Sequence, residues 1–238
     1  MIADRTVVGL TLRGLVAGRR GIALALVAAL PVLAAVAASL GEVDPELAWA
    51  RQVQRLIIPV VVAFIAVVIS SGSVSDQRDD GTILYLASTP MPRIRLAGSL
   101  IVASWLAAMA IMVPSILLAA TIALRGAIDA PAVLWPLTGA ALAALAYSAL
   151  GVWAAMVLRH PVVAGVLYIL LWEGTFANWT DSAEQFSVAA YARALAVEGV
   201  ERVNAPEVSV PLAVVALAAV AGAALVAAGR RFTRTELP

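Results

Sequence analysis

The sequence contains no cysteine and a single histidine, and all 16 of its basic residues are arginine. Without thiolates, disulfides, iron–sulfur clusters and cysteine-bound zinc are excluded, and one histidine cannot supply paired haem ligands. Charge is scarce too: 13% of the residues are charged and 63% are hydrophobic, whereas soluble domains carry about 25% charged residues. The composition is therefore that of an integral membrane protein, and 238 residues suit one membrane domain.

Several catalytic motifs are also missing. The chain has no G-x-x-x-x-G-K-[ST] phosphate-binding loop, no H-E-x-x-H and no G-x-S-x-G. It therefore cannot bind and hydrolyse ATP through a phosphate loop, and the usual signatures of zinc proteases and serine hydrolases are absent. We expect no cofactor in this chain, no catalytic residue and no nucleic-acid partner.

Long apolar runs dominate what is present. A helix that crosses a membrane needs about 20 largely apolar residues, and six runs meet that requirement. We expect an all-α integral membrane protein of six transmembrane helices in a single domain that spans residues 1–238. Alanine and glycine are frequent in the third, fourth and sixth runs, which favours a tightly packed bundle and an oligomer. The predicted spans are residues 21–40, 54–74, 97–124, 131–158, 161–178 and 208–229.

The arginines are distributed unevenly between the two sides of the membrane. Six spans place both termini on one side, and most arginines fall on that side. Cytoplasmic loops carry the excess of positive charge, so we expect both termini to be cytoplasmic, in a bacterial cytoplasmic membrane. The arginines on the terminal side are Arg5, Arg13, Arg19, Arg20, Arg78, Arg93, Arg95, Arg159, Arg230, Arg231 and Arg234, against Arg51, Arg55, Arg125, Arg193 and Arg202 opposite.

Two polar segments flank the spans. In residues 1–20, Val8, Leu12 and Leu15 share one helical face while Arg13 and Arg20 share another, which predicts an amphipathic helix on the inner membrane surface rather than a frayed tail. Residues 179–207 form the predicted extracellular segment, where FSVAAYARALAVEGV has helical periodicity. We expect one or two short helices there, resting on or dipping into the outer leaflet.

The loop at residues 75–96 is the most informative stretch. Asp79, Asp80 and Gly81 can begin a helix, because carboxylates are favoured at a helix N-terminus, and Pro90 ends it. A solvated loop would not normally display so many large apolar side chains, and an exposed apolar patch indicates a partner surface. The predicted docking residues are Asp79, Asp80, Gly81, Thr82, Ile83, Leu84, Leu86, Pro90 and Arg93.

Two alternatives apply to this loop. The short helix could fold back onto the bilayer without a partner. Asp76, Asp79 and Asp80 could instead hold a metal ion in a membrane phosphotransferase of the CDP-alcohol class. That class uses a longer motif with an Ala-Arg pair and further aspartates at fixed spacings, and these are missing here.

The loop resembles the one between the second and third spans of type-2 (ABC-2-like) ABC exporter permeases. In that family an acid precedes Gly-Thr, an apolar helix, a Ser/Thr-Pro turn and an arginine. The surface helix, the six spans and the long outer segment follow the same layout. The family often has Glu where this chain has Asp. The matching residues are Asp79 or Asp80, Gly81–Thr82, Ile83–Ala87, Ser88–Pro90 and Arg93.

The resemblance implies a half-transporter, in which the loop is a coupling helix seated on a separate ATP-binding cassette subunit. ATP and Mg would be bound by that partner, and a second, identical or different permease chain would complete a dimer. Because the spans have little polar lining, we expect export of amphipathic or apolar substrates such as a drug (as in multidrug efflux), a lipid-like molecule or a peptide. A non-transporting assembly or sensor module is the alternative.

Glu173 is the only carboxylate placed inside a predicted span. It lies about 18 Å along a helix that starts at Pro161, in the outer half of the membrane. A buried charge in lipid is costly and is a functional candidate by default. Its partner could be Arg193 or the outer helices, in a substrate pathway or in a structural anchor. The one histidine, His160, is expected at the inner interface.

Overall fold

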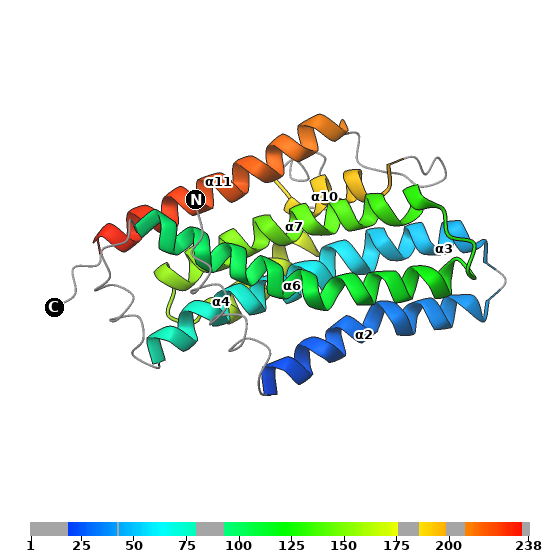
Figure 1. The fold of residues 1–238 in the computed structure, drawn as a ribbon, viewed down its shortest axis with the longest axis horizontal. Coiled ribbons are helices and arrows are strands. Elements are labelled where there is room, and N and C mark those ends of the chain that lie inside the picture. Colours follow the sequence, from blue (N-terminus) through cyan, green and yellow to red (C-terminus); the bar gives the residue numbers. More distant parts are fainter. Residues whose placement is uncertain (1–18, 42, 80–92, 176–185, 199–207, 235–238) are drawn as a thin grey trace.

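The computed structural model describes residues 19–41, 43–79, 93–175, 186–198 and 208–234, and these residues form helices with no strand among them. The long helices run side by side in one elongated bundle (Figure 1). Among the described residues, five helices are long and apolar enough to cross a membrane. The predicted all-α membrane architecture is therefore confirmed.

Five of the six predicted spans coincide with these long helices. The second is longer than predicted, because α3, η1 and α4 follow one another without a break from Pro45 to Asp79. Asp44 accepts a hydrogen bond from the Glu46 amide at 3.0 Å and caps its start. The bounds are α2 Arg19–Ser39, α3 Pro45–Gln52, η1 Val53–Val62, α4 Ala63–Asp79, α6 Arg93–Ala123, α7 Ala130–Val157 and α11 Val210–Arg234.

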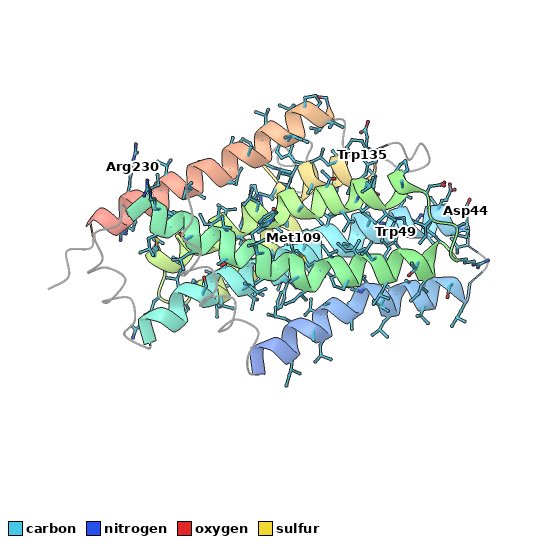
Figure 2. The ribbon with its side chains drawn as sticks, viewed as in Figure 1. Asp44, Trp49, Met109, Trp135 and Arg230 are labelled. Atoms are coloured by element: carbon cyan, nitrogen blue, oxygen red, sulfur yellow. The ribbon has the colours of Figure 1, made fainter. Side chains whose placement is uncertain are left out.

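The helix ends define two ends of the bundle. The start of α2, the end of α4, the start of α6 and the end of α11 lie toward one end, here called the terminal end (Figure 1). The helix α3 and the turn between α6 and α7 lie at the opposite end. Figure 2 shows Arg230 toward the terminal end and Asp44 at the opposite end. The predicted docking loop, which joins α4 to α6, therefore begins and ends at the terminal end of the bundle.

Small residues bring the central helices close together. A Cβ atom on Gly151 of α7 would lie 1.9 Å from the Ser70 hydroxyl oxygen of α4, and one on Gly139 would lie 2.7 Å from the Ala192 carbonyl oxygen. Real side chains do not tolerate such distances, so these helices pack at a separation that only glycine permits. The tight bundle expected from the alanine and glycine content is the one observed.

At the opposite end, Arg125 connects the end of α2 to the turn between α6 and α7. This residue adopts a left-handed conformation, with φ of 51°, and Gly126 follows with φ of 82°. The turn directs the Arg125 guanidinium to donate to the Ser39 carbonyl at 3.3 Å and the Gly41 carbonyl at 3.1 Å. The end of α2 is thereby held against the turn that joins α6 to α7.

The fifth predicted span is broken. Its helix consists of α8 (Pro161–Leu167) and η2 (Tyr168–Glu173) and gives way to a turn at Gly174. Those residues span roughly 20 Å of helix, less than the hydrocarbon core of about 30 Å. The prediction of one continuous helix over residues 161–178 is therefore wrong in length.

A second short helix, α10 (Val188–Ala196), lies in the half of the bundle that contains α3 (Figure 1). It packs against α7, α11 and η1, and seven of its nine residues are buried. The sequence predicted a helix here but placed it on or in the outer leaflet, and α10 is instead part of the bundle. Its alanines let it approach α7 at Gly139, which explains the difference.

The N-terminal surface helix predicted for residues 1–20 lies outside the described residues, apart from Arg19 and Arg20, which begin α2.

Candidate functional site

The predicted docking loop lies almost entirely outside the described residues. Asp79 is the last residue of α4 and Arg93 is the first residue of α6. The role of the loop therefore stays a prediction. The docking residues outside the described ranges are Asp80, Gly81, Thr82, Ile83, Leu84, Leu86 and Pro90.

Glu173 forms the centre of a buried polar cluster. Its side chain is 3% exposed although it lies at the end of η2. The Tyr147 hydroxyl of α7 donates to Glu173 Oε1 at 3.0 Å, and the Tyr168 hydroxyl donates to the same oxygen at 3.1 Å. The carboxylate therefore joins η2 to the middle of α7.

The start of α10 supplies the other donors. The Ser187 hydroxyl donates to Glu173 Oε2, and the Val188 amide donates to Oε1 at 3.1 Å. Ser187 also accepts a hydrogen bond from the Ala190 amide at 3.0 Å, so it caps α10. A carboxylate only accepts hydrogen bonds, and it is stabilised at a helix N-terminus, where amide groups point outward. All four of these groups donate hydrogen bonds to the Glu173 oxygens.

The cluster connects η2 to α10. The segment η2 ends at Glu173, and Ser187 and Val188, at the start of α10, bind the same carboxylate. A buried charge without partners would cost several kcal/mol, and the four donors offset that cost. The sequence singled out Glu173 and named the outer helices among its possible partners, and the start of α10 supplies two of its donors.

The sequence did not identify the three hydroxyl partners. Ser187 carries a recognisable signal, because a serine directly before an apolar run is a preferred helix cap. Tyr147 and Tyr168 carry none, since a tyrosine within an apolar span is expected simply to pack against neighbouring helices. Arg193, the other partner named from the sequence, lies on α10 and lines the same cavity as Glu173.

A cavity of about 540 Å³ lies beside Glu173, between η1, η2 and α10. Its polar lining residues gather at one end and its apolar residues continue toward the terminal end along the two helices. The cavity is therefore amphipathic. The polar residues are Gln54, Arg55, Glu173 and Arg193, and the apolar ones include Val60, Phe64, Val166 and Leu170.

Most of the lining residues belong to the two π-helical segments, η1 and η2. In η1, Pro59 has no amide hydrogen, so the Arg55 carbonyl cannot receive its usual helical hydrogen bond. The wider π-helical turns accommodate the proline. The segment η2 has no proline, and its sequence does not predict a π-helix. Such segments occur frequently at functional sites, and here two of them border one cavity.

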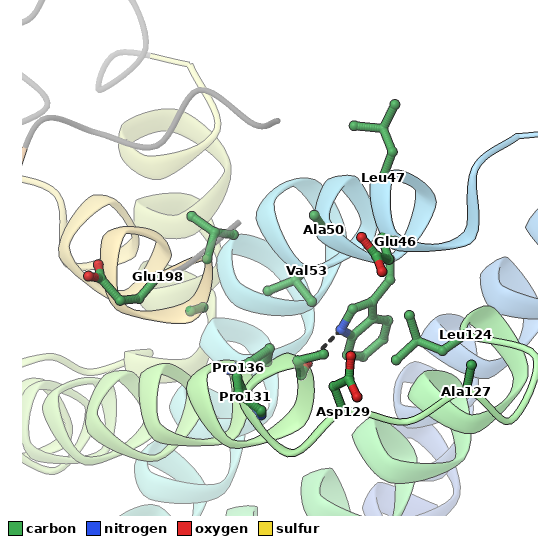
Figure 3. A pocket seen from close by; sticks show the side chains of 14 residues that line it. Glu46, Leu47, Ala50, Val53, Leu124, Ala127, Asp129, Pro131, Pro136 and Glu198 are labelled. Atoms are coloured by element: carbon green, nitrogen blue, oxygen red, sulfur yellow. Dashed lines mark hydrogen bonds between the residues drawn. The ribbon is translucent and has the colours of Figure 1, made fainter. Parts of the chain in front are cut away.

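A second cavity, of about 600 Å³, opens at the opposite end of the bundle. Figure 3 shows Glu46 and Asp129 on one side of it and Glu198, in the turn that follows α10, on the other. Trp49 and Ala132 both line this cavity, and the Trp49 indole donates to the Ala132 carbonyl at 2.8 Å. Within the described ranges, no group of three or more histidine, cysteine or acidic residues is arranged to hold a metal ion.

Comparison with known proteins agrees with this architecture. The sequence profile of a family described as ABC-2 family transporter protein matches residues 17–193, which is most of the chain. The matched region includes α2 through α8, η2, the predicted docking loop and most of α10. No curated protein matches the chain.

Proposed function

This chain belongs to the ABC-2 transporter family and is a permease of an ABC transporter, and we propose that it works as the membrane subunit of an ATP-driven exporter. In this proposal two permease chains form the pathway in the cytoplasmic membrane, and each engages an ATP-binding cassette subunit. ATP and Mg are bound by that partner. The terminal end of the bundle faces the cytoplasm.

The family match over residues 17–193 is the observation that carries the proposal. The arginine distribution supports the orientation, because the arginine-rich side is the cytoplasmic one. The docking loop then joins α4 to α6 on the side where a cytoplasmic ATPase would meet it. The absence of a phosphate-binding loop in this chain is consistent with a separate source of energy.

The proposed mechanism is mechanical. Nucleotide-driven closure of the partner ATPases pushes the loop between Asp79 and Pro90, and the bundle opens outward. The helix that ends at Asp79 is continuous through α4 into η1, which lines the cavity beside Glu173. A displacement at the loop is therefore transmitted along one rigid element to the cavity wall.

Amphipathic or apolar molecules are the proposed substrates. Polar groups at one end of the cavity and apolar side chains at the other suit a molecule with the same division. The exposed apolar rim, with Val60 at 41% and Leu170 at 61% exposure, faces outward from the bundle. A drug, a lipid-like molecule and a peptide all satisfy this description.

The first experiment is purification of the tagged chain from its native membrane in mild detergent. An ATP-binding subunit should co-purify in equal amount with the unmodified chain and be lost with Leu86→Arg. The matched control is Val43→Arg, which places the same charge on an exposed apolar position at the opposite end of the bundle. Retention of the ATPase by Leu86→Arg would contradict the docking role. Absence of any ATPase would point to a non-transporting membrane module.

A further inference from the structure

We propose that the cavity between η1, η2 and α10 binds a single-chain amphiphile with an anionic head group, and that Arg55 provides the charge contact. This inference rests on the proposed function and narrows its substrate class. It depends on three features of the cavity: its division into polar and apolar ends, its net charge and its lateral opening.

The dimensions suit a hydrocarbon chain with a head group. On the helix that runs from η1 into α4, Gln54 and Arg55 mark the polar end and Phe64 marks the apolar end. Nine to ten residues of helix separate them, which corresponds to about 15 Å. On the antiparallel helix, seven residues separate Glu173 at the polar end from Val166 at the apolar end, which corresponds to about 10 Å. A head group at Arg55 therefore places a chain of about ten carbons along Phe64 and Val166.

The sign of the charge points to an anion. Three ionisable residues line the described part of the cavity: Arg55 and Arg193 are positive and Glu173 is negative, so the lining carries +2 − 1 = +1. Glu173 is already occupied by its four donors. A cationic amphiphile would add a further positive charge beside the two arginines, whereas an anionic head group would neutralise the net charge of the lining.

Arg55 is the residue placed to make that contact. Its side chain is exposed while lining the cavity, and no hydrogen bond or ion pair engages it within the part of the chain that the structure describes. Guanidinium groups bind carboxylate and phosphate groups through paired hydrogen bonds. Arg55 can therefore accept an anionic head group without giving up an existing partner among the described residues.

The cavity opens toward the side of the bundle. Val60 and Leu170 belong to its lining and are also exposed on the outer surface of the helices. An amphiphile in the bilayer can therefore enter or leave sideways, with its chain in the apolar phase and its head group at the level of Arg55. This route does not require a charged group to cross the hydrocarbon core, which would be costly.

Equilibrium binding of four radiolabelled probes tests the proposal. The permease, with its co-purifying partners, is placed in phosphatidylcholine nanodiscs and titrated with laurate, dodecyl phosphate, dodecanol and dodecyltrimethylammonium, with empty nanodiscs as background. We expect both anionic probes to bind about tenfold more tightly than dodecanol, because a charge-assisted hydrogen bond contributes at about that level. Inorganic phosphate at the same concentration should not displace them.

The decisive variant is Arg55→Gln, which should bring the anionic probes to the affinity of dodecanol and leave dodecanol unchanged. The control is Arg51→Gln, one turn earlier, where the arginine is also exposed but does not line the cavity. Equal affinity for anionic, neutral and cationic probes would overturn the proposal and leave Arg55 as an interfacial anchor. Displacement by inorganic phosphate would show a simple anion site and would overturn the role of the chain.

Probe binding and co-purification of the ATPase separate the two proposals. If the anionic probes bind at Arg55 but no ATPase co-purifies, the exporter function fails and the binding site survives. If the ATPase co-purifies, is lost with Leu86→Arg, and the probes bind without regard to charge, the exporter function survives and the substrate class is wrong.

Discussion

The Tyr147 hydroxyl lies 3.0 Å from Glu173 Oε1, and this contact joins the middle of α7 to the residue at which η2 ends. Tyr147 is completely buried. The same oxygen receives the amide of Val188 at the start of α10. One side chain therefore fixes the relative positions of three helical elements, and the stability of the outer half of the bundle should depend on it.

Replacing Tyr147 with phenylalanine removes one of the donors to Glu173 without changing the packed ring. We expect a loss of about 1–3 kcal/mol of stability, the usual effect when a buried charged group loses a hydrogen bond. Tyr168→Phe removes a donor to the same oxygen from a half-buried position, where water can take its place, and should cost less. The measurement is the thermal unfolding midpoint in detergent. A larger shift for Tyr168→Phe would contradict the arrangement.

Replacing Ser187 with alanine removes both the cap of α10 and a donor to Glu173. A lost cap alone costs about 1 kcal/mol, so the combined effect should exceed that value. Ser39→Ala is the control, because the Ser39 hydroxyl bonds only to the nearby Val36 carbonyl in an exposed position. Hydrogen exchange along α10 reports the change directly. Unaltered protection of α10 in Ser187→Ala would show that the cap is dispensable.

Glycine-to-alanine changes should separate close packing from helix propensity. At Gly139 the added methyl group meets the Ala192 backbone, and at Gly151 it meets the Ser70 hydroxyl, which is itself bonded to the Ala66 carbonyl at 2.7 Å. Each substitution should cost about 1–3 kcal/mol through overpacking. Gly222 on α11 has no atom within 4 Å of an added Cβ, so Gly222→Ala should be neutral or stabilising by up to about 1 kcal/mol.

If all three glycine-to-alanine variants shifted the thermal unfolding midpoint in the same direction and by the same amount, the close packing would be contradicted. Helix propensity would then determine the stability change at each position.

The absence of native cysteine allows a direct test of orientation and of the placement of α10. Glu198→Cys, in the exposed turn that follows α10, should react with a membrane-impermeant maleimide added outside intact cells. Ala192→Cys, completely buried between α10 and α7, should not react until the protein is denatured. Rapid labelling of Ala192→Cys would place α10 on the membrane surface. Labelling of Glu198→Cys only after the cells are opened would reverse the proposed orientation.

Much of the fold follows from local composition. A run of about 20 apolar residues is long enough to cross a membrane as a helix, so the positions of α2, α4, α6, α7 and α11 could be predicted without any knowledge of their neighbours. The docking prediction for the residues from Asp79 to Arg93 likewise depends on a short stretch of sequence, and the predicted orientation needs only the positions of the arginines relative to the spans. The family match agrees with the prediction of an ABC-2 permease.

The tertiary structure decided where the fifth predicted span breaks and what surrounds its carboxylate. Glu173 can lie inside the bundle only because Tyr147, 26 residues before it, and Ser187, 14 residues after it, are brought to its two oxygens. No local pattern specifies a contact across such separations. The sequence by itself therefore determined the membrane bundle and pointed to Glu173, while packing between distant helices determined the broken span, the buried α10 and the cavity that Arg55 lines.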